Sequence, residues 1–273
     1  MKILGEIVDP ILIYQMGKVG SSSVYRSLKH AGIPNSIFHV HQLSDKGIER
    51  KEKWLKYHNA LDIPWVVEDL LYIKKFKESI ETNRSKFQWK IITMTREPIS
   101  VKLSAFFENI EVYGHEVFDP PKKINIDKTI DYLMRNTFGV YDVEKDYYCT
   151  WFDEELKTVF GIDVYTVPYD FTRGYSIITK ENVSVLVMRL EDMGRSFQQA
   201  MAYFLKVPNI ELIKDNTADR KSYWNEYRTV LEKIVISAEV FDLIYSSRYA
   251  RHFYPTGERE KSREKWVSDA AMA

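Results

Sequence analysis

The chain has 273 residues, of which 45% are apolar, and its 39 basic side chains are matched by 39 acidic ones. This composition is typical of a soluble globular protein, and a net charge of zero argues against bulk electrostatic binding to nucleic acid or to acidic membranes. The single cysteine excludes an internal disulfide framework. No run approaches the ~20 apolar residues that span a bilayer. We therefore expect a cytoplasmic protein with no nucleic-acid partner and no transmembrane segment.

Strands and helices are predicted to alternate along the chain. Apolar runs predict strands at 11–14, 36–40, 89–95 and 183–190. Helical spacing of apolar residues predicts helices at 24–31, 46–57, 65–87, 99–110, 196–206 and 222–245, and the segment 113–125 is predicted as a loop. This alternation predicts an α/β fold, a P-loop-containing three-layer sandwich in which helices flank a mainly parallel central sheet. We expect one domain over residues 1–255, followed by a charged surface tail over 256–273.

A glycine loop follows the first predicted strand. Residues 15–23 read QMGKVGSSS and lead into a predicted helix. At such a junction, backbone N–H groups and the helix dipole can hold an anion. Gly20 allows close backbone approach, and the three serines that follow it add hydroxyl donors. The triphosphatase pattern G-x-x-x-x-G-K-[ST] is absent, because Lys18 comes two positions before the glycine. The loop therefore predicts a phosphate-binding site whose chemistry differs from that of the triphosphatases.

A second motif closes the strand predicted at 89–95. Arg96 follows this strand, in the sequence Arg-Glu-Pro, and Ser104 comes eight positions later, about two turns into the next helix. An arginine at the carboxyl end of a parallel strand faces the crevice in which α/β folds bind ligands. Its guanidinium also suits bidentate contact with a phosphate. Arg96 and Ser104 are thus candidates for a second phosphate site.

Taken together, the two motifs resemble those of sulfotransferases that use 3′-phosphoadenosine 5′-phosphosulfate (PAPS). The sequence KVGSSS from Lys18 is similar to their 5′-phosphosulfate loop, K-x-G-[ST]-[ST]-[ST], and the spacing from Arg96 to Ser104 is similar to their 3′-phosphate motif. The segment 186–192, LVMRLED, resembles a late strand of the same superfamily. The segments 151–155 and 161–165 resemble proteins catalogued under capsular polysaccharide synthesis.

The resemblance implies a donor site that needs no metal. Lys18 would contact the phosphosulfate and stabilise the charge that in-line transfer leaves on the phosphate oxygen. Arg96 and Ser104 would bind the 3′-phosphate of PAPS, and of adenosine 3′,5′-bisphosphate after transfer. The cofactor-binding residues predicted for the first loop are Gly17, Lys18, Val19, Gly20, Ser21, Ser22 and Ser23.

Two histidines are candidates for the base that such a transfer requires. His39 and His41 lie at the end of the strand predicted at 36–40, and alternation places both on the same side of it. The sequence FHVH resembles the "YHGH" element of uronyl 2-O-sulfotransferases, in which a histidine is the base. Histidine titrates near neutral pH, which suits this role. We predict that His41 or His39 is catalytic.

The sequence therefore predicts a PAPS-dependent sulfotransferase that acts on a carbohydrate hydroxyl, in capsular or exopolysaccharide synthesis. One alternative is a P-loop kinase acting on a small molecule, because Glu191 and Asp192 follow a predicted strand as a magnesium-binding carboxylate would. Another is a non-catalytic glycan-binding or assembly protein on the same fold. Metal-free binding of adenosine 3′,5′-bisphosphate favours sulfotransfer, whereas magnesium-dependent ATP binding favours the kinase.

Overall fold

The protein is described by a computed structural model over residues 9–59 and 61–267. Its contacts divide the chain into two compact units. Unit 1 comprises Met1–Thr95 and Trp151–Asp215, and unit 2 comprises Arg96–Thr150 and Asn216–Ala273. The single domain over 1–255 stays a prediction. Residues 1–8 of that predicted domain and 268–273 of the predicted tail lie outside the described residues.

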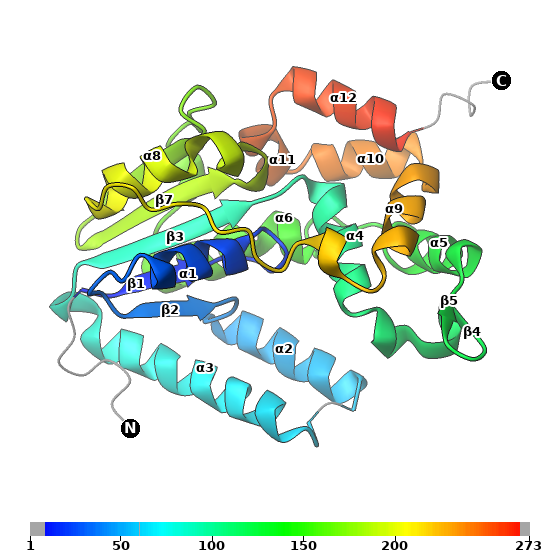
Figure 1. Cartoon of the computed structure of the whole chain (residues 1–273), viewed down its shortest axis with the longest axis horizontal. Coiled ribbons are helices and arrows are strands. Elements are labelled where there is room, and N and C mark those ends of the chain that lie inside the picture. The colour runs from blue at the N-terminus through cyan, green and yellow to red at the C-terminus, as the bar shows by residue number, and fades with distance from the viewer. Residues whose placement is uncertain (1–8, 60, 268–273) are drawn as a thin grey trace. The chain divides into compact units, whose positions relative to one another are not determined.

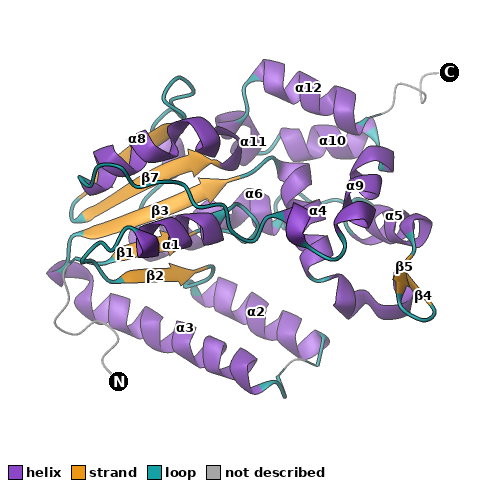
Figure 2. Cartoon of the chain, viewed as in Figure 1, coloured by secondary structure: helices purple, strands orange, loops and turns teal. Residues whose placement is uncertain are grey.

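Unit 1 is built on a five-stranded sheet with the order β2-β1-β3-β7-β6 (Figure 2). The strands are β1 (Ile11–Tyr14), β2 (Ile37–Val40), β3 (Trp89–Thr95), β6 (Tyr175–Lys180) and β7 (Val183–Arg189). Four of them run parallel, and β6 pairs antiparallel with β7 at the edge. The mostly parallel sheet with helices confirms the predicted α/β class. Of the five strands of this sheet, β6 alone had no counterpart among the predicted strands.

Helices cover both faces of this sheet. Those of unit 1 are α1 (Ser21–His30), α2 (Asp45–Tyr57), α3 (Pro64–Asn83), the π-helical turn η3 (Phe152–Lys157), α7 (Thr158–Phe160) and α8 (Met193–Leu205). Tyr25 of α1 stacks on His39 with ring centroids 5.7 Å apart, and Phe76 of α3 stacks on Phe38 at 4.7 Å. Because neighbouring strand residues point to opposite faces, α1 and α3 lie on opposite sides of β2. In Figure 1, α1 lies in front of the sheet.

The strand register explains why two loops of unit 1 meet. β1 lies between β2 and β3, and Ile13 pairs with His39 on one side and with Ile92 on the other. The carboxyl ends of parallel strands lie at the same edge of a sheet. The loop that follows β1 therefore begins beside the histidines that end β2.

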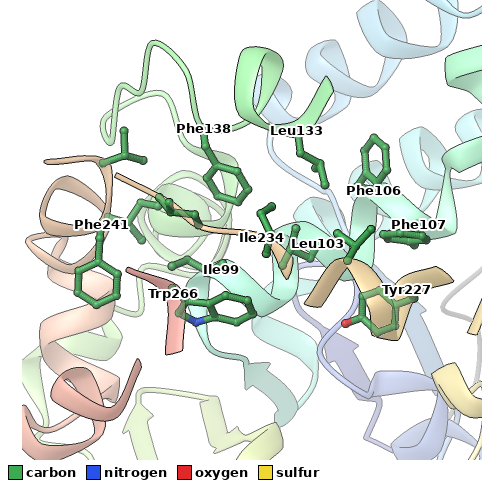
Figure 3. Packing of buried hydrophobic residues seen from close by; sticks show 14 of the residues in the cluster. Ile99, Leu103, Phe106, Phe107, Leu133, Phe138, Tyr227, Ile234, Phe241 and Trp266 are labelled. Carbon is green, nitrogen blue, oxygen red and sulfur yellow. The ribbon is translucent and has the colours of Figure 1, made fainter. Parts of the chain in front are cut away.

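Unit 2 is mainly helical. Its elements are α4 (Pro98–Glu108), α5 (Ile126–Asn136), α9 (Trp224–Lys233), α10 (Ala238–Tyr245), α11 (Arg248–Phe253), α12 (Thr256–Trp266) and the hairpin of β4 (Phe118–Asp119) and β5 (Lys123–Ile124). Helix α6 (Tyr147–Trp151) lies where the chain passes from unit 2 to unit 1. Figure 3 shows the core of unit 2, in which Leu103, Phe107, Leu133, Tyr227 and Trp266 are buried together.

Short 3-10 helices complete both units. They are η1 (Arg84–Lys86), η4 (Val164–Thr166) and η5 (Leu190–Asp192) in unit 1, and η2 (Ile110–Glu116) and η6 (Ala218–Arg220) in unit 2.

Three predicted segments of unit 2 differ from the structure. The helix predicted at 222–245 is broken into α9 and α10, because Ser237 caps α10 and Ile236 donates its N–H to the carbonyl of Trp266 at 2.8 Å. Residues 256–266 of the predicted surface tail form α12, which is largely exposed but places Trp266 in the core at 1% exposure. The loop predicted at 113–125 contains the β4–β5 hairpin.

Gly20 is a position at which only glycine fits without strain. Its φ is +88°, in the left-handed region that L side chains rarely adopt, and a Cβ would lie 2.7 Å from Cδ1 of Leu190. Gly20→Ala is therefore expected to lower the free energy of unfolding by about 1–2 kcal/mol. Gly17→Ala is the control, since its Cβ would meet no atom within 4 Å. Urea unfolding measures both, and equal stability of the two variants would contradict the expectation.

Candidate functional site

A polar cluster lies where β1 and β2 end in unit 1. Gln15 directly follows β1 and is fully buried, at 0% exposure. Its side chain lies between the two histidines: Nε2 is 3.0 Å from Nε2 of His39, and Oε1 is 3.1 Å from Nδ1 of His41. The two imidazole rings are 5.1 Å apart, on the same side of the strand as alternation predicts. The cluster thus joins three side chains through one buried amide.

Hydrogen-bond roles distinguish the two histidines. Nδ1 of His41 faces two acceptors, the backbone carbonyl of Gln15 at 3.0 Å and its side-chain Oε1. This nitrogen must therefore carry the proton, which leaves Nε2 of the neutral ring with a lone pair. His39 differs, because its Nε2 lies 3.0 Å from the Gln15 amide nitrogen and 3.0 Å from the Ser21 hydroxyl. Within the described residues, Nε2 of His41 makes no hydrogen bond.

Both histidines are electrically neutral at pH 7. Burial, with a smaller contribution from His41, lowers the pKa of His39 to about 4. Burial also lowers the pKa of His41, although its hydrogen bond to the backbone of Gln15 acts in the opposite direction. The positive charges of Lys51 and Lys18 lower the pKa of His41 further. The cluster therefore presents imidazole rings that can accept protons.

The loop after β1 combines an unusual backbone with an uncapped helix. Lys18 has φ +68°, a left-handed conformation that costs a non-glycine residue about 1–2 kcal/mol. Such strain persists where the surrounding structure enforces it, and it is concentrated at binding and catalytic sites. Helix α1 begins at Ser21, and no side chain caps its first turn. The N–H of Ser23 donates to the carbonyl of Gly20 at 3.1 Å, whereas the N–H groups of Ser21 and Ser22 make no hydrogen bond within the described residues and can attract an anion.

The predicted loop residues have different surroundings. The hydroxyl of Ser21 contacts His39, and that of Ser23 accepts from the N–H of Asp215 at 3.0 Å. Ser22 is half-buried, and its hydroxyl makes no hydrogen bond within the described chain. Val19 is fully buried, so its side chain supports the loop from the core. Of the three serines, Ser22 is thus the one whose hydroxyl is not engaged by the protein.

Glu155 is a buried carboxylate that the sequence reasoning missed. It accepts hydrogen bonds from Tyr14 on β1, from the N–H of Leu43 at 2.8 Å, and from both the N–H and the hydroxyl of Ser44. Burial raises the pKa of Glu155 against the opposing effect of these donors. Nearby, Nε1 of Trp151 donates to the carbonyl of His41 at 2.9 Å. These contacts fix the backbone on the carboxyl side of His41.

In the sequence, nothing distinguishes Glu155 from the two acids that precede it. Asp153, Glu154 and Glu155 form one acidic run, which is typical of a solvated helix face. One local signal was available, because Ser44 precedes a charged helical segment and is a good capping residue. That signal predicts the start of α2, but it does not predict the distant carboxylate that holds it.

The second predicted motif lies in unit 2. Both the N–H and the carbonyl of Arg96 contact the hydroxyl of Tyr249, at 3.0 and 2.7 Å. Glu97 caps α4 by accepting from the N–H of Ser100 at 2.7 Å. Ser104 is 9% exposed, and its hydroxyl makes no hydrogen bond within the described residues. The backbone of Arg96 is therefore held by the protein, while the hydroxyl of Ser104 is not.

A buried ion pair in unit 2 was also not predicted. Lys102 of α4 pairs with Asp146, which also accepts from the hydroxyl of Tyr141 and from the N–H of Cys149. Burial raises the pKa of the Cys149 thiol to about 11. The thiol is therefore protonated at neutral pH, so that Cys149 is a packed residue with little nucleophilic character.

Comparison with known families adds one finding. Residues 121–255 match the NKWYS family model, described as "Putative capsular polysaccharide synthesis protein". The chain is similar to that family over just under half of its length. This agrees with the resemblance of the segments 151–155 and 161–165 to proteins of capsular polysaccharide synthesis. The matched range includes Glu155 and Trp151, but it excludes the loop after β1, the histidine pair, Arg96 and Ser104.

A search of curated proteins found no match. Over residues 9–59 and 61–267, no helix combines the length and apolar character needed to cross a membrane.

The lowered pKa of His39 predicts a pH-dependent stability. Between pH 6.5 and about 4 the unfolded chain binds a proton that the folded ring excludes, so stability falls as pH falls through this window. The loss for His39 amounts to about 3 kcal/mol at most, and His41 acts in the same direction. Urea unfolding at several pH values should show a shallower slope for His39→Gln than for His30→Gln, a control on the exposed end of α1. Equal slopes would contradict the assignment.

Proposed function

We propose that the chain is a PAPS-dependent sulfotransferase that transfers a sulfuryl group to a hydroxyl of a carbohydrate. The observation that carries the proposal is the arrangement at the ends of β1 and β2. There, Lys18 is held in a left-handed conformation beside an uncapped helix N-terminus, and a pair of neutral histidines lies at the same edge of the sheet. The family match supports a glycan as the acceptor.

In this proposal the phosphosulfate binds at the start of α1. The N–H groups of the first helical turn and the helix dipole favour the negative phosphate, and the free hydroxyl of Ser22 adds a donor. The acceptor oxygen attacks sulfur, and the bond from sulfur to the bridging phosphate oxygen breaks. Lys18 stabilises the negative charge that this bond leaves on the phosphate. The residues Gly17, Val19 and Gly20 contribute through the backbone of the loop.

His41 is the better candidate for the base. Its Nδ1–H is fixed by the two oxygens of Gln15, so that the ring has one orientation and Nε2 can take the proton of the acceptor hydroxyl. Nε2 of His39 already faces the Gln15 amide and Ser21. The negative charge of a bound donor raises the pKa of a nearby imidazole, which moves a lowered pKa toward the range of an effective base. His39 then serves to orient Gln15.

The assignment of Arg96 and Ser104 to the 3′-phosphate remains a prediction for unit 2. The Nη2 atom of Arg96 lies 3.4 Å from the hydroxyl of Tyr227, and the planar guanidinium is the side chain best suited to bidentate contact with a phosphate. The hydroxyl of Ser104, on α4, is a further donor.

The kinase alternative is disfavoured by the surroundings of Asp192. This carboxylate is buried and accepts from Nε of Arg189 at 2.6 Å, from Nη2 of Arg195 at 2.8 Å and from the hydroxyl of Tyr169 at 3.0 Å. Its charge is thus already compensated by two arginines, which weakens it as a ligand for magnesium. In the described part of the chain, no three His, Cys, Asp or Glu side chains gather as metal ligands.

Donor binding is the first test of the proposal. Calorimetry with adenosine 3′,5′-bisphosphate in the presence of a chelator should show binding to the wild type. Lys18→Ala and Arg96→Ala should each weaken it about tenfold or more, because each removes a charge-assisted hydrogen bond. Lys53→Ala is the control, since Lys53 is exposed on α2 and pairs with Glu49.

The outcomes of this experiment separate the alternatives. Absence of metal-free binding to the wild type would overturn the proposal, and binding of ATP only with magnesium would favour the kinase. If Arg96→Ala binds as tightly as the wild type, the 3′-phosphate assignment is wrong. Binding without sulfate transfer to any tested glycan would support the non-catalytic alternative.

Measurement of turnover tests the assignment of His41 as the base. His41→Ala should lower kcat about 100-fold or more with little change in donor affinity, since general-base catalysis contributes about 10²–10⁴-fold. His39→Ala should have a smaller effect, because its role is to orient Gln15. If both variants retain wild-type kcat at neutral pH, neither histidine is the base.

A further inference from the structure

A pocket of about 400 Å³ lies in unit 2 among α10, α11 and α12, the orange to red helices of Figure 1. Its volume falls in the range of small-molecule sites. Three arginines line it, Arg251, Arg259 and Arg263, together with the carboxylates of Asp242 and Glu260. Every one of these residues belongs to unit 2, so the pocket is complete without unit 1.

Two of the three guanidinium groups retain donors for a ligand. Arg263 is engaged, because it pairs with Asp242. Arg259 donates from Nη2 to the hydroxyl of Thr256 at 3.0 Å, and its Nη1 makes no hydrogen bond among the described residues. Arg251 is exposed and forms no ion pair within the described chain. The N–H groups that Arg251 and Arg259 leave open can donate charge-assisted hydrogen bonds to an oxyanion in the pocket.

The charges of the lining favour a ligand with a single negative charge. Asp242 is neutralised by Arg263, so that Arg251 and Arg259 face Glu260 alone. This leaves one more cation than anion. A ligand with one negative charge neutralises this excess, whereas a phosphate dianion would leave a net negative charge in the pocket.

The rest of the lining suits a sugar ring. Phe241 and Tyr245 stack on each other, with centroids 4.2 Å apart and planes 18° from parallel, and both line the pocket. Both side chains are buried, at 3% and 4% exposure, and Arg263 lies over the Phe241 ring, so that only a narrow apolar strip of the pair reaches the pocket. The C–H groups of a sugar can pack against this strip, while hydroxyl groups reach polar neighbours. Part of the lining, from Phe241 to Arg251, lies within the range matched by the capsular polysaccharide family.

We propose that this pocket binds a sugar residue that carries one singly charged oxyanion, either a carboxylate or a sulfate ester. The recognition is by Arg251 and Arg259 for the anion and by the pair Phe241–Tyr245 for the ring. The site does not rest on the donor site proposed above, because it lies within unit 2 and is tested without any nucleotide.

Saturation-transfer NMR and calorimetry with methyl β-D-glucuronide test the proposal against a neutral isostere, methyl β-D-glucoside. The glucuronide, the 6-sulfate of the glucoside, or both should bind at least tenfold more tightly than the glucoside, and more tightly than glucose 6-phosphate. The monoanion that binds more tightly shows whether the pocket prefers a carboxylate or a sulfate ester. Equal binding of both monoanions and the glucoside, or the tightest binding by the phosphate, would overturn the proposal.

Arginine substitutions inside and outside the pocket test where the ligand binds. Arg259→Gln and Arg251→Gln should each weaken the better monoanion at least fivefold. Arg228→Gln should not, because Arg228 is exposed on α9, outside the pocket. Arg251 is exposed, so its variant should fold normally even if Arg259→Gln does not. If Arg251→Gln binds like the wild type, or if no probe binds the wild type at millimolar concentration, the assignment of this pocket is wrong.

Discussion

The arrangement of unit 1 depends on one buried carboxylate, that of Glu155. A charge out of contact with water is tolerated only when donors surround it, and here Tyr14, Leu43 and Ser44 supply them. These donors come from β1 and from the segment that joins β2 to α2. The close fit extends to Gly47, where a Cβ would lie 1.7 Å from Oε1 of Glu155. The carboxylate thereby ties three separate parts of the chain to one point.

These contacts determine the position of His41 in the candidate site. Trp151, four residues before Glu155, holds the carbonyl of His41, while Glu155 holds the two N–H groups at Leu43 and Ser44. The backbone that carries the imidazole of His41 is thus held in place on the carboxyl side of this residue. On the other side, parallel pairing of β1 and β2 brings Gln15 within hydrogen-bond distance of both histidines. Parallel pairing and a buried acid together fix the position of the histidine pair.

Much of the fold was predictable because its signals are local. The apolar runs of β1, β3 and β7 are buried on both faces, and such strands read as continuous hydrophobic segments. The edge strand β6 lacks this pattern. It has no continuous apolar run, and its last two residues, Thr179 and Lys180, are exposed. The break between α9 and α10 was not predictable from spacing, because apolar residues continue through it at Ile234 and Ile236. There, pairing with the end of α12 determines the backbone.

By itself, the sequence determined the glycine turn that leads from β1 into α1, the position of the histidine pair and the α/β class. Each follows from residues that are adjacent in the chain, a glycine before a serine-rich helix or two histidines in alternation. Only the tertiary structure decided that Gln15 orients the histidines, that Glu155 is buried, and that three arginines of α11 and α12 share a pocket. These features join residues far apart in sequence or dispersed among ordinary surface charges. Their roles arise from burial and hydrogen-bond geometry, which no local pattern encodes.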